Sequence, residues 1–161
     1  MNILDGHLAK WIGFALVIAF LDQVTKYFAT RHLSYGEPIA VMSGVNFTLL
    51  HNTGAAFSFL HDQGGWQRWL FVTLTLVISV GLIVWLKRLR KGDITTHIAI
   101  CLILAGAFGN LADRLLWGYV IAFIQLYYST WYWPTFNVAD ASISVGAALL
   151  IFKGGNGEKA N

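Results

Sequence analysis

The sequence predicts an all-α integral membrane protein with four transmembrane helices, a small β-sheet cradle and a loop or short helix on its outer face. We expect one membrane-embedded domain over residues 1–161. Of the 161 residues, 57% are hydrophobic and only 12% are charged, and the mean hydropathy of +0.60 lies outside the range of soluble proteins. The apolar residues also gather in long uncharged runs, as helices that cross a lipid bilayer require.

Four apolar runs predict the spans. They cover residues 11–29, 69–86, 94–112 and 138–153. The second and third runs contain eighteen and nineteen residues without Asp, Glu, Lys or Arg, enough to cross the hydrocarbon core. The first run is apolar over residues 11–21 and amphipathic after that. No small-x-small cleavage site follows its apolar part, where Asp22, Gln23 and Lys26 come instead. We therefore expect a retained anchor and not a secretory signal.

The connection between the second and third spans fixes the expected orientation. It carries Lys87, Arg88, Arg90 and Lys91, and short loops rich in Lys and Arg stay in the cytoplasm. By alternation, both termini are expected in the cytoplasm, and residues 30–68 and 115–136 outside.

The first outer segment is long enough to hold structure of its own. Residues 45–49 alternate apolar and polar side chains, which predicts a half-buried strand and a small outer sheet. Tryptophans beside the predicted spans are typical of the membrane interface. They are Trp66, Trp69, Trp117, Trp131 and Trp133.

Composition and motifs exclude several kinds of function. The net charge of +3 is explained by the topology signals, so we expect no nucleic-acid partner. The single cysteine, Cys101, has no partner for a disulfide or a CxxC site. The five histidines show no HExxH spacing, and no GxSxG motif occurs. We expect no metal and no cofactor.

Carboxylates at membrane depth are costly and need a partner or a function. Asp22 and Lys26 are four residues apart, a spacing that predicts a local ion pair at the interface. Asp113 closes the third span, and Asp140 opens the fourth, where it could also be a helix N-cap. Three segments thus bring carboxylates to the same outer depth, which favours a site.

Two close carboxylates are sufficient for hydrolysis, because they share one proton and act as base and acid toward water. From the residues alone, the expected pair is Asp113 with Asp140.

Four motifs, in order along nearly the whole chain, resemble those of bacterial lipoprotein signal peptidases (signal peptidase II). Residues 22–26 read DQVTK, residues 52–59 NTGAAFSF, residues 106–114 GAFGNLADR and residues 136–140 FNVAD, followed by Ile143. Each block alone is weak evidence. Together, they identify the chain as similar to this family of aspartic peptidases.

The resemblance implies cleavage of diacylglyceryl-modified prolipoproteins just before the lipidated cysteine. It places the protein in the bacterial inner (cytoplasmic) membrane, with the active site toward the outer leaflet. It also implies contacts with membrane lipid, inhibition by cyclic peptides such as globomycin, and a monomer. The binding or supporting residues would be Asn52, Gly54, Asn110, Asp113, Arg114, Asn137, Asp22 and Lys26.

One departure from the family concerns catalysis itself. The family's dyad takes one aspartate from the FNxAD block, here Asp140, and the other from a VVDF-like block. In this chain that block reads VIAF, with Ala122 at the dyad position. The resemblance therefore implies an inactivating Asp-to-Ala change, engineered or natural, that leaves binding intact.

Three other interpretations remain open. The chain could be a natural noncatalytic relative that binds lipidated peptides. It could be a small four-helix transporter with Asp22 as its coupling carboxylate. Alternatively, Asp113 could replace the missing dyad member and keep the peptidase active.

Overall fold

A computed structural model describes residues 6–54 and 65–157 of the chain. It contains four helices and four strands, in the order α1 (Gly6–His32), β1 (Ile39–Met42), β2 (Val45–Asn52), α2 (Trp66–Arg88), α3 (Ile94–Leu116), β3 (Val120–Tyr128), β4 (Trp131–Tyr132) and α4 (Val138–Gly157). The helices coincide with the four predicted apolar runs and extend beyond most of their ends.

Within the described residues, three helices, α1, α2 and α3, are long and apolar enough to cross a membrane. α4 is helical where a span is predicted but does not belong to this group, so the fourth span stays a prediction.

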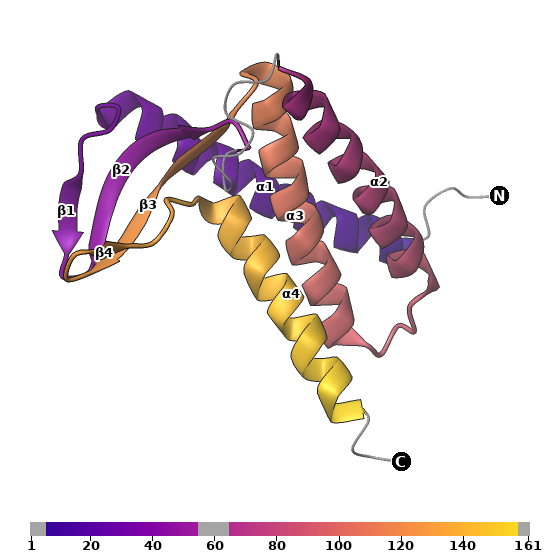
Figure 1. The fold of residues 1–161 in the computed structure, drawn as a ribbon. Coiled ribbons are helices and arrows are strands. Elements are labelled where there is room, and N and C mark those ends of the chain that lie inside the picture. The colour runs from indigo at the N-terminus through magenta and orange to yellow at the C-terminus, as the bar shows by residue number, and fades with distance from the viewer. Residues whose placement is uncertain (1–5, 55–64, 158–161) are drawn as a thin grey trace.

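α3 is the central helix, and α1, α2 and α4 pack around it (Figure 1). Small residues allow the close approach of α3 and α4. A Cβ at Gly146 would lie 2.6 Å from the carbonyl oxygen of Ala99, and one at Gly106 would overlap the carbonyl oxygen of Ala139. Small residues on both helices therefore permit the close packing of α3 and α4.

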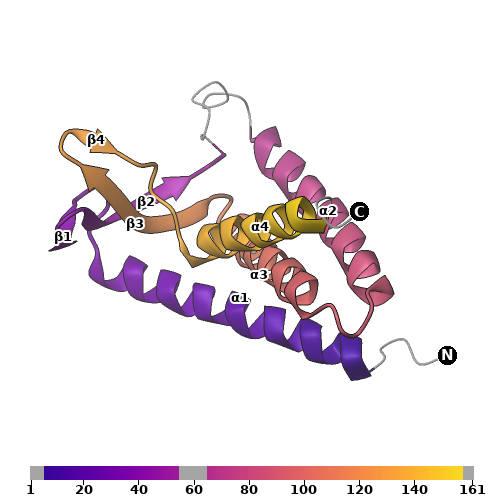
Figure 2. The same ribbon diagram turned by 90° about the horizontal axis from the view of Figure 1, so that it is seen from below.

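The strands form one antiparallel sheet in the order β1-β2-β3-β4. It lies alongside the C-terminal half of α1 and to one side of α2, α3 and α4 (Figure 2). β2 confirms the strand predicted from alternation. β3 pairs with β2, with Ala122 opposite Leu50, and no strand was predicted in its segment. The expected outer loop or short helix falls partly on residues 55–64, which lie outside the described residues.

Two contacts bring helix ends together away from the sheet. Nε2 of His7 on α1 lies 3.1 Å from Nε2 of His97 on α3. Lys153 on α4 forms an ion pair with Asp93, just before α3. Hydrogen bonds from Lys153 and Thr96 lower the pKa of Asp93 to about 2. The start of α1 and the end of α4 therefore lie beside the basic connection between α2 and α3.

Candidate active site

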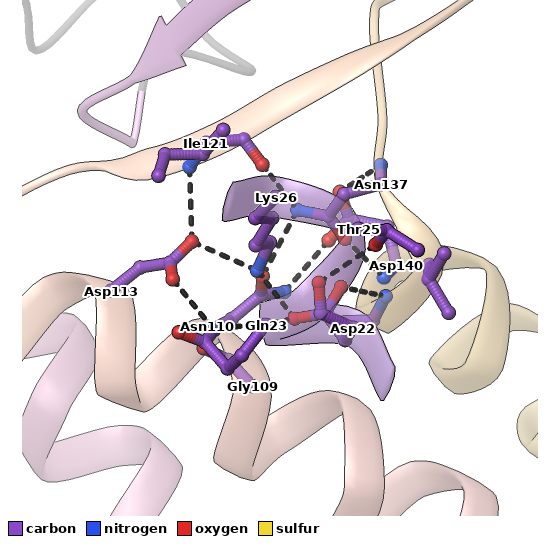
Figure 3. Close-up of polar contacts among 12 residues, drawn as sticks. Asp22, Gln23, Thr25, Lys26, Gly109, Asn110, Asp113, Ile121, Asn137 and Asp140 are labelled. Atoms are coloured by element: carbon purple, nitrogen blue, oxygen red, sulfur yellow. Dashed lines mark hydrogen bonds and ion pairs between the residues drawn. The ribbon is translucent and has the colours of Figure 1, made fainter. Parts of the chain in front are cut away.

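Lys26 lies at the centre of a buried polar network near the sheet (Figure 3). Its Nζ atom lies 2.7 Å from Oδ2 of Asp22, 2.8 Å from Oδ2 of Asp113 and 3.1 Å from Oδ1 of Asn110. Its three N–H groups thus have three acceptors. The predicted ion pair with Asp22 exists, and the Lys26 side chain is only 1% exposed.

The two carboxylates that pair with Lys26 also bind backbone groups. Asp22 accepts a hydrogen bond of 2.8 Å from the amide of Ala139 on α4. Asp113 accepts one of 3.0 Å from the amide of Ile121 on β3. Because Asp22 is on α1 and Asp113 on α3, the network ties three helices to the strand that carries position 122.

Asp113 does not have the surroundings of a catalytic acid. Its second oxygen accepts a bond of 2.8 Å from Nε2 of Gln23, and its side chain is fully buried. Its ion-pair partner is Lys26, not the adjacent Arg114. Gln23 is a member of the network to which the sequence analysis assigned no role, although it belongs to the DQVTK motif.

Asp140 and Asn137 form a capping box at the start of α4. Oδ1 of Asn137 accepts a bond of 2.7 Å from the amide of Asp140, and Oδ2 of Asp140 accepts one of 3.2 Å from the amide of Asn137. The N-cap is therefore Asn137, and Asp140 occupies the third helical position. Asn110 donates a further bond of 2.8 Å to Oδ1 of Asp140.

The residue beside position 122 is bonded to the same asparagine. Nδ2 of Asn137 donates a bond of 2.9 Å to the carbonyl oxygen of Ile121. Asp113 and Asn137 thus bind the amide and carbonyl of Ile121, as a neighbouring strand would. Asn137 is therefore bonded to Asp140 and to the neighbour of Ala122 at once.

Strand alternation gives the face on which the Ala122 side chain lies. Ile121 and Phe123 line two cavities against α1. Because successive side chains of a strand point to opposite faces, Ala122, which follows Ile121, faces away from α1. Its side chain is 2% exposed.

The cavity beside Asp140 has a volume of about 540 Å³. Its walls come from the end of β2, from β3, from the segment before α4 and from α4 itself. They include Asn52, Leu126, Trp133, Phe136, Asp140 and Ser144. Its size and apolar walls are typical of a site that binds an organic ligand.

Asn52 lines this cavity. Gly54 is bonded to Asn52, and Arg114 is bonded to Asn110 of the polar network. Oδ1 of Asn52 accepts a bond of 2.8 Å from the amide of Gly54. At Gly54 (φ 111°) a side chain would overlap the ring of Phe71. The Arg114 guanidinium lies 5.0 Å from the centre of the same ring and donates to the carbonyl oxygen of Asn110. Residues 55–59 of the outer motif lie outside the described residues.

His51 on β2 lies in an aromatic stack on the sheet. Its ring is 4.0 Å from that of Tyr119 and 4.9 Å from that of Tyr35. Burial lowers the pKa of His51 below its usual value of 6.5. Among the residues that the structure describes, no three His, Cys, Asp or Glu side chains are grouped to hold a metal ion.

Known proteins resemble the chain over most of its length. The sequence model of the family "Signal peptidase (SPase) II" matches residues 14–154. A lipoprotein signal peptidase of Hydrogenovibrio crunogenus is 48% identical over 151 residues, which cover 94% of this chain and 88% of the relative. One from Pseudomonas aeruginosa is 48% identical over 142 residues, covering 87% and 84%.

The fold also resembles a solved structure described as a bacterial membrane enzyme at 2.3 Å resolution. The TM-score is 0.78 at 31% identity, and the match covers 90% of this chain and 87% of that one.

Proposed function

The chain belongs to the signal peptidase II family of lipoprotein signal peptidases, and from this premise we propose that position 122 and Asp140 are its two dyad positions. The family consists of aspartic peptidases, which are hydrolases. With alanine at position 122, this chain binds lipid-modified precursors but does not cut them.

The double attachment of Asn137 is the observation that carries this proposal. Its side chain binds the Ile121 carbonyl and the Asp140 amide, at 2.9 and 2.7 Å. Because Ala122 follows Ile121 and its side chain faces away from α1, we expect a carboxyl group at position 122 to lie toward Asp140. The bonds of Asn137 thus hold β3 and the start of α4 together, even though position 122 carries no carboxylate.

The expected loss of activity follows from the chemistry of a dyad. One carboxylate takes a proton from the attacking water, and the other, protonated, polarises the scissile carbonyl. An acid or base typically contributes about 100-fold to 10,000-fold in rate, and residues that act together can lose nearly all of it when one is removed. Asp140 alone supplies only one of the two functions.

The substrate class is a diacylglyceryl-modified prolipoprotein, cut before its lipidated cysteine. Burial of acyl chains against apolar walls contributes about 0.8 kcal/mol per CH₂ group, and the outer sheet would hold the extended peptide segment. Cyclic peptides of the globomycin type would compete for the same cavity and contact Asp140. The family consists of bacterial membrane proteins.

We propose that α4 is the fourth span and that a monomer lies in the inner membrane with its termini in the cytoplasm. Support comes from the basic connection between α2 and α3, which lies beside the start of α1 and the end of α4. The sheet and Asp140 then lie at the outer leaflet.

The test compares cleavage of a diacylglyceryl-modified precursor in detergent by this chain and by the Ala122→Asp variant. We expect only the variant to cut, while both bind the precursor. Equal cleavage by both would assign the second carboxylate to another residue. No cleavage by either, with both proteins folded, would contradict the peptidase assignment of this site. Gradient-driven transport in proteoliposomes would instead support a transporter with Asp22 as its coupling carboxylate.

A further inference from the structure

A second cavity, of about 310 Å³, lies between the C-terminal half of α1 and the sheet (Figure 2). One wall is a single face of α1, because its residues follow the i, i+3, i+4, i+7 spacing of a helix stripe. They are Thr25, Phe28, Ala29 and His32. The opposite wall is formed by Phe47 of β2 and Phe123 of β3, whose ring centres are 6.1 Å apart.

The walls of this cavity offer few polar groups to water. The hydroxyl of Thr25 already donates to the carbonyl oxygen of Asp22 at 2.7 Å. Nδ1 of His32 already bonds the carbonyl oxygen of Phe28 at 2.9 Å. The other lining side chains are apolar. A buried water molecule needs about two to four polar partners, so the cavity suits a hydrocarbon ligand better than water.

The cavity opens to the outside along Phe28, whose side chain is 55% exposed. Thr25 and Phe28 belong to the predicted first span, and His32 lies beyond it, about 10 Å further along the helix than Thr25. In the proposed orientation, this end of α1 is at the outer leaflet. A ligand in the cavity would therefore extend from the depth of the acyl chains to the level of the headgroups.

A cation lies at the headgroup end of the cavity. Arg31 is in the last turn of α1, three residues from Phe28, and this spacing places the two side chains next to each other on the helix. The Arg31 guanidinium lies 5.2 Å from the centre of the Tyr27 ring. Within residues 6–54 and 65–157, no ion pair includes Arg31. Because guanidinium groups bind phosphate oxygens well, an anionic headgroup complements this place.

We propose that this cavity binds one phospholipid of the outer leaflet, with an acyl chain between α1 and the two phenylalanines and its phosphate at Arg31. A methylene group is about as large as a water molecule, so the cavity holds roughly ten of them. Each buried methylene strengthens binding about fourfold. The bound chain also packs against β3 next to the proposed dyad position, because Phe123 follows Ala122 in that strand.

The inference goes beyond the proposed function, and it rests on the proposed orientation of α1 and not on the chemistry of the dyad. The lipid is a component of the bilayer and not the precursor that is cut. The two differ in one chemical group, since a diacylglyceryl modification carries no phosphate.

The first measurement is the melting temperature of this chain in a neutral detergent, titrated with phosphatidylglycerol. A ligand that binds only the folded state raises the melting temperature in proportion to its occupancy and affinity. We expect a gain with a defined midpoint, and a smaller gain from a diacylglycerol with the same acyl chains. No gain from phosphatidylglycerol would overturn the proposal. An equal gain from the diacylglycerol would also overturn it, because the phosphate would then contribute nothing.

Arg31→Gln tests the contact with the headgroup. A cation near an anionic headgroup contributes about fivefold in affinity, so the same gain should need about five times more phosphatidylglycerol. Arg90→Gln is the matched control, since it removes the same charge from the exposed connection between α2 and α3. It should leave the titration unchanged. Equal shifts in both variants would show a general attraction of anionic lipid and would overturn the site at Arg31.

Ala29→Phe tests the cavity itself. Ala29 is 6% exposed and lines the cavity, so a phenyl ring at this position takes up the space of the acyl chain. We expect the gain from phosphatidylglycerol to disappear. Val17→Phe adds the same ring at an exposed position of α1, and this control should keep the full gain. A full gain in Ala29→Phe would contradict an acyl chain in this cavity.

Overpacking by Ala29→Phe can itself destabilise the protein, so a second variant enlarges the cavity instead. Leu33 also lines it, and Leu33→Ala should lower the melting temperature in detergent alone. Phosphatidylglycerol should restore part of this loss, because the acyl chain occupies the space that the leucine leaves. An equal loss with and without the lipid would overturn the proposal.

These measurements need no cleavage, so failure of this inference can be distinguished from failure of the proposed function. If the Ala122→Asp protein cuts its precursor but phosphatidylglycerol does not stabilise this chain, the lipid site fails and the proposed function stands. If the lipid and the variants behave as expected but the Ala122→Asp protein does not cut, the lipid site stands and the proposed function fails.

Discussion

Nζ of Lys26 lies 2.8 Å from a carboxylate oxygen of Asp113, and the two side chains are 1% and 0% exposed. The pair joins the first helix to the third in a region without solvent. Asp22 is a second buried carboxylate on the same ammonium. Breaking a buried ion pair on one side leaves an uncompensated charge, which costs far more than the pair contributes by itself.

Replacement of Lys26 by methionine should therefore destabilise the protein strongly. It leaves Asp22 and Asp113 buried without their cation, and we expect a loss of about 3–5 kcal/mol in the free energy of unfolding. Thermal unfolding in detergent measures it. Lys10→Met, the same change at an exposed position of α1, is the control and should have little effect. Similar melting temperatures for the two variants would contradict a charged, structural role for Lys26.

Gly106→Ala should disturb the site through the contact between α3 and α4. A methyl group there would overlap the carbonyl oxygen of Ala139, one residue before Asp140. Overpacking of this kind typically costs about 1–3 kcal/mol, and a displaced α4 start should also weaken binding of a cyclic peptide inhibitor. Gly81→Ala is the control, because a Cβ at Gly81 on α2 meets nothing within 4 Å. Unchanged stability and binding in Gly106→Ala would show that α4 moves without cost.

His51 should make stability depend on pH. Its pKa is lowered in the folded state by burial, so the unfolded chain binds a proton more readily than the folded one. The neutral, buried His51 therefore contributes to the free energy of unfolding above the unfolded pKa of about 6.5, and this contribution is lost as the pH falls below that value. Melting temperatures of the parent and of His51→Phe, which keeps an aromatic ring, should converge or cross between pH 8 and pH 5. Parallel curves would show that His51 is not responsible.

Hydropathy alone predicts the helices, because a lipid solvent requires long runs in which each backbone group is bonded inside its own segment. The strand at residues 45–49 is predicted because its apolar and polar side chains alternate, although the structure buries the polar Asn46 and Thr48 and exposes Phe47. β3 is not predicted. Its sequence, VIAFIQLYY, begins with a continuous apolar run, and buried strands lack the alternation that distinguishes them from the end of a helix.

Local spacing finds the pairing of Asp22 with Lys26 but not the partner of Asp113. The adjacent Arg114 cannot reach Asp113 easily, since neighbouring residues of a helix point about 100° apart. The true partner, Lys26, is on another helix, and such long-range contacts depend on packing that no local pattern encodes. In the same way, no local pattern predicts that Asn137 joins β3 to the start of α4, because this contact also depends on the packing of the folded chain.

Addition of a carboxyl group at position 122 should lower stability while restoring activity. The side chain at position 122 is 2% exposed, so a new carboxyl group there loses water, and if the two positions form the dyad it also crowds the carboxylate of Asp140. We expect Ala122→Asp to lower the free energy of unfolding by about 1–3 kcal/mol, measured by thermal or denaturant unfolding in detergent at neutral pH.

The double variant Ala122→Asp with Asp140→Asn separates crowding from simple burial. If the two carboxylates repel each other, the double variant should be more stable than the sum of the single changes predicts, since asparagine removes the second charge. Additive effects would mean that the two groups do not interact, which would contradict a shared proton. A clear gain of stability in Ala122→Asp alone would show that the site is built to hold a carboxyl group there at no cost. In that case, alanine at position 122 would abolish catalysis without making the chain more stable.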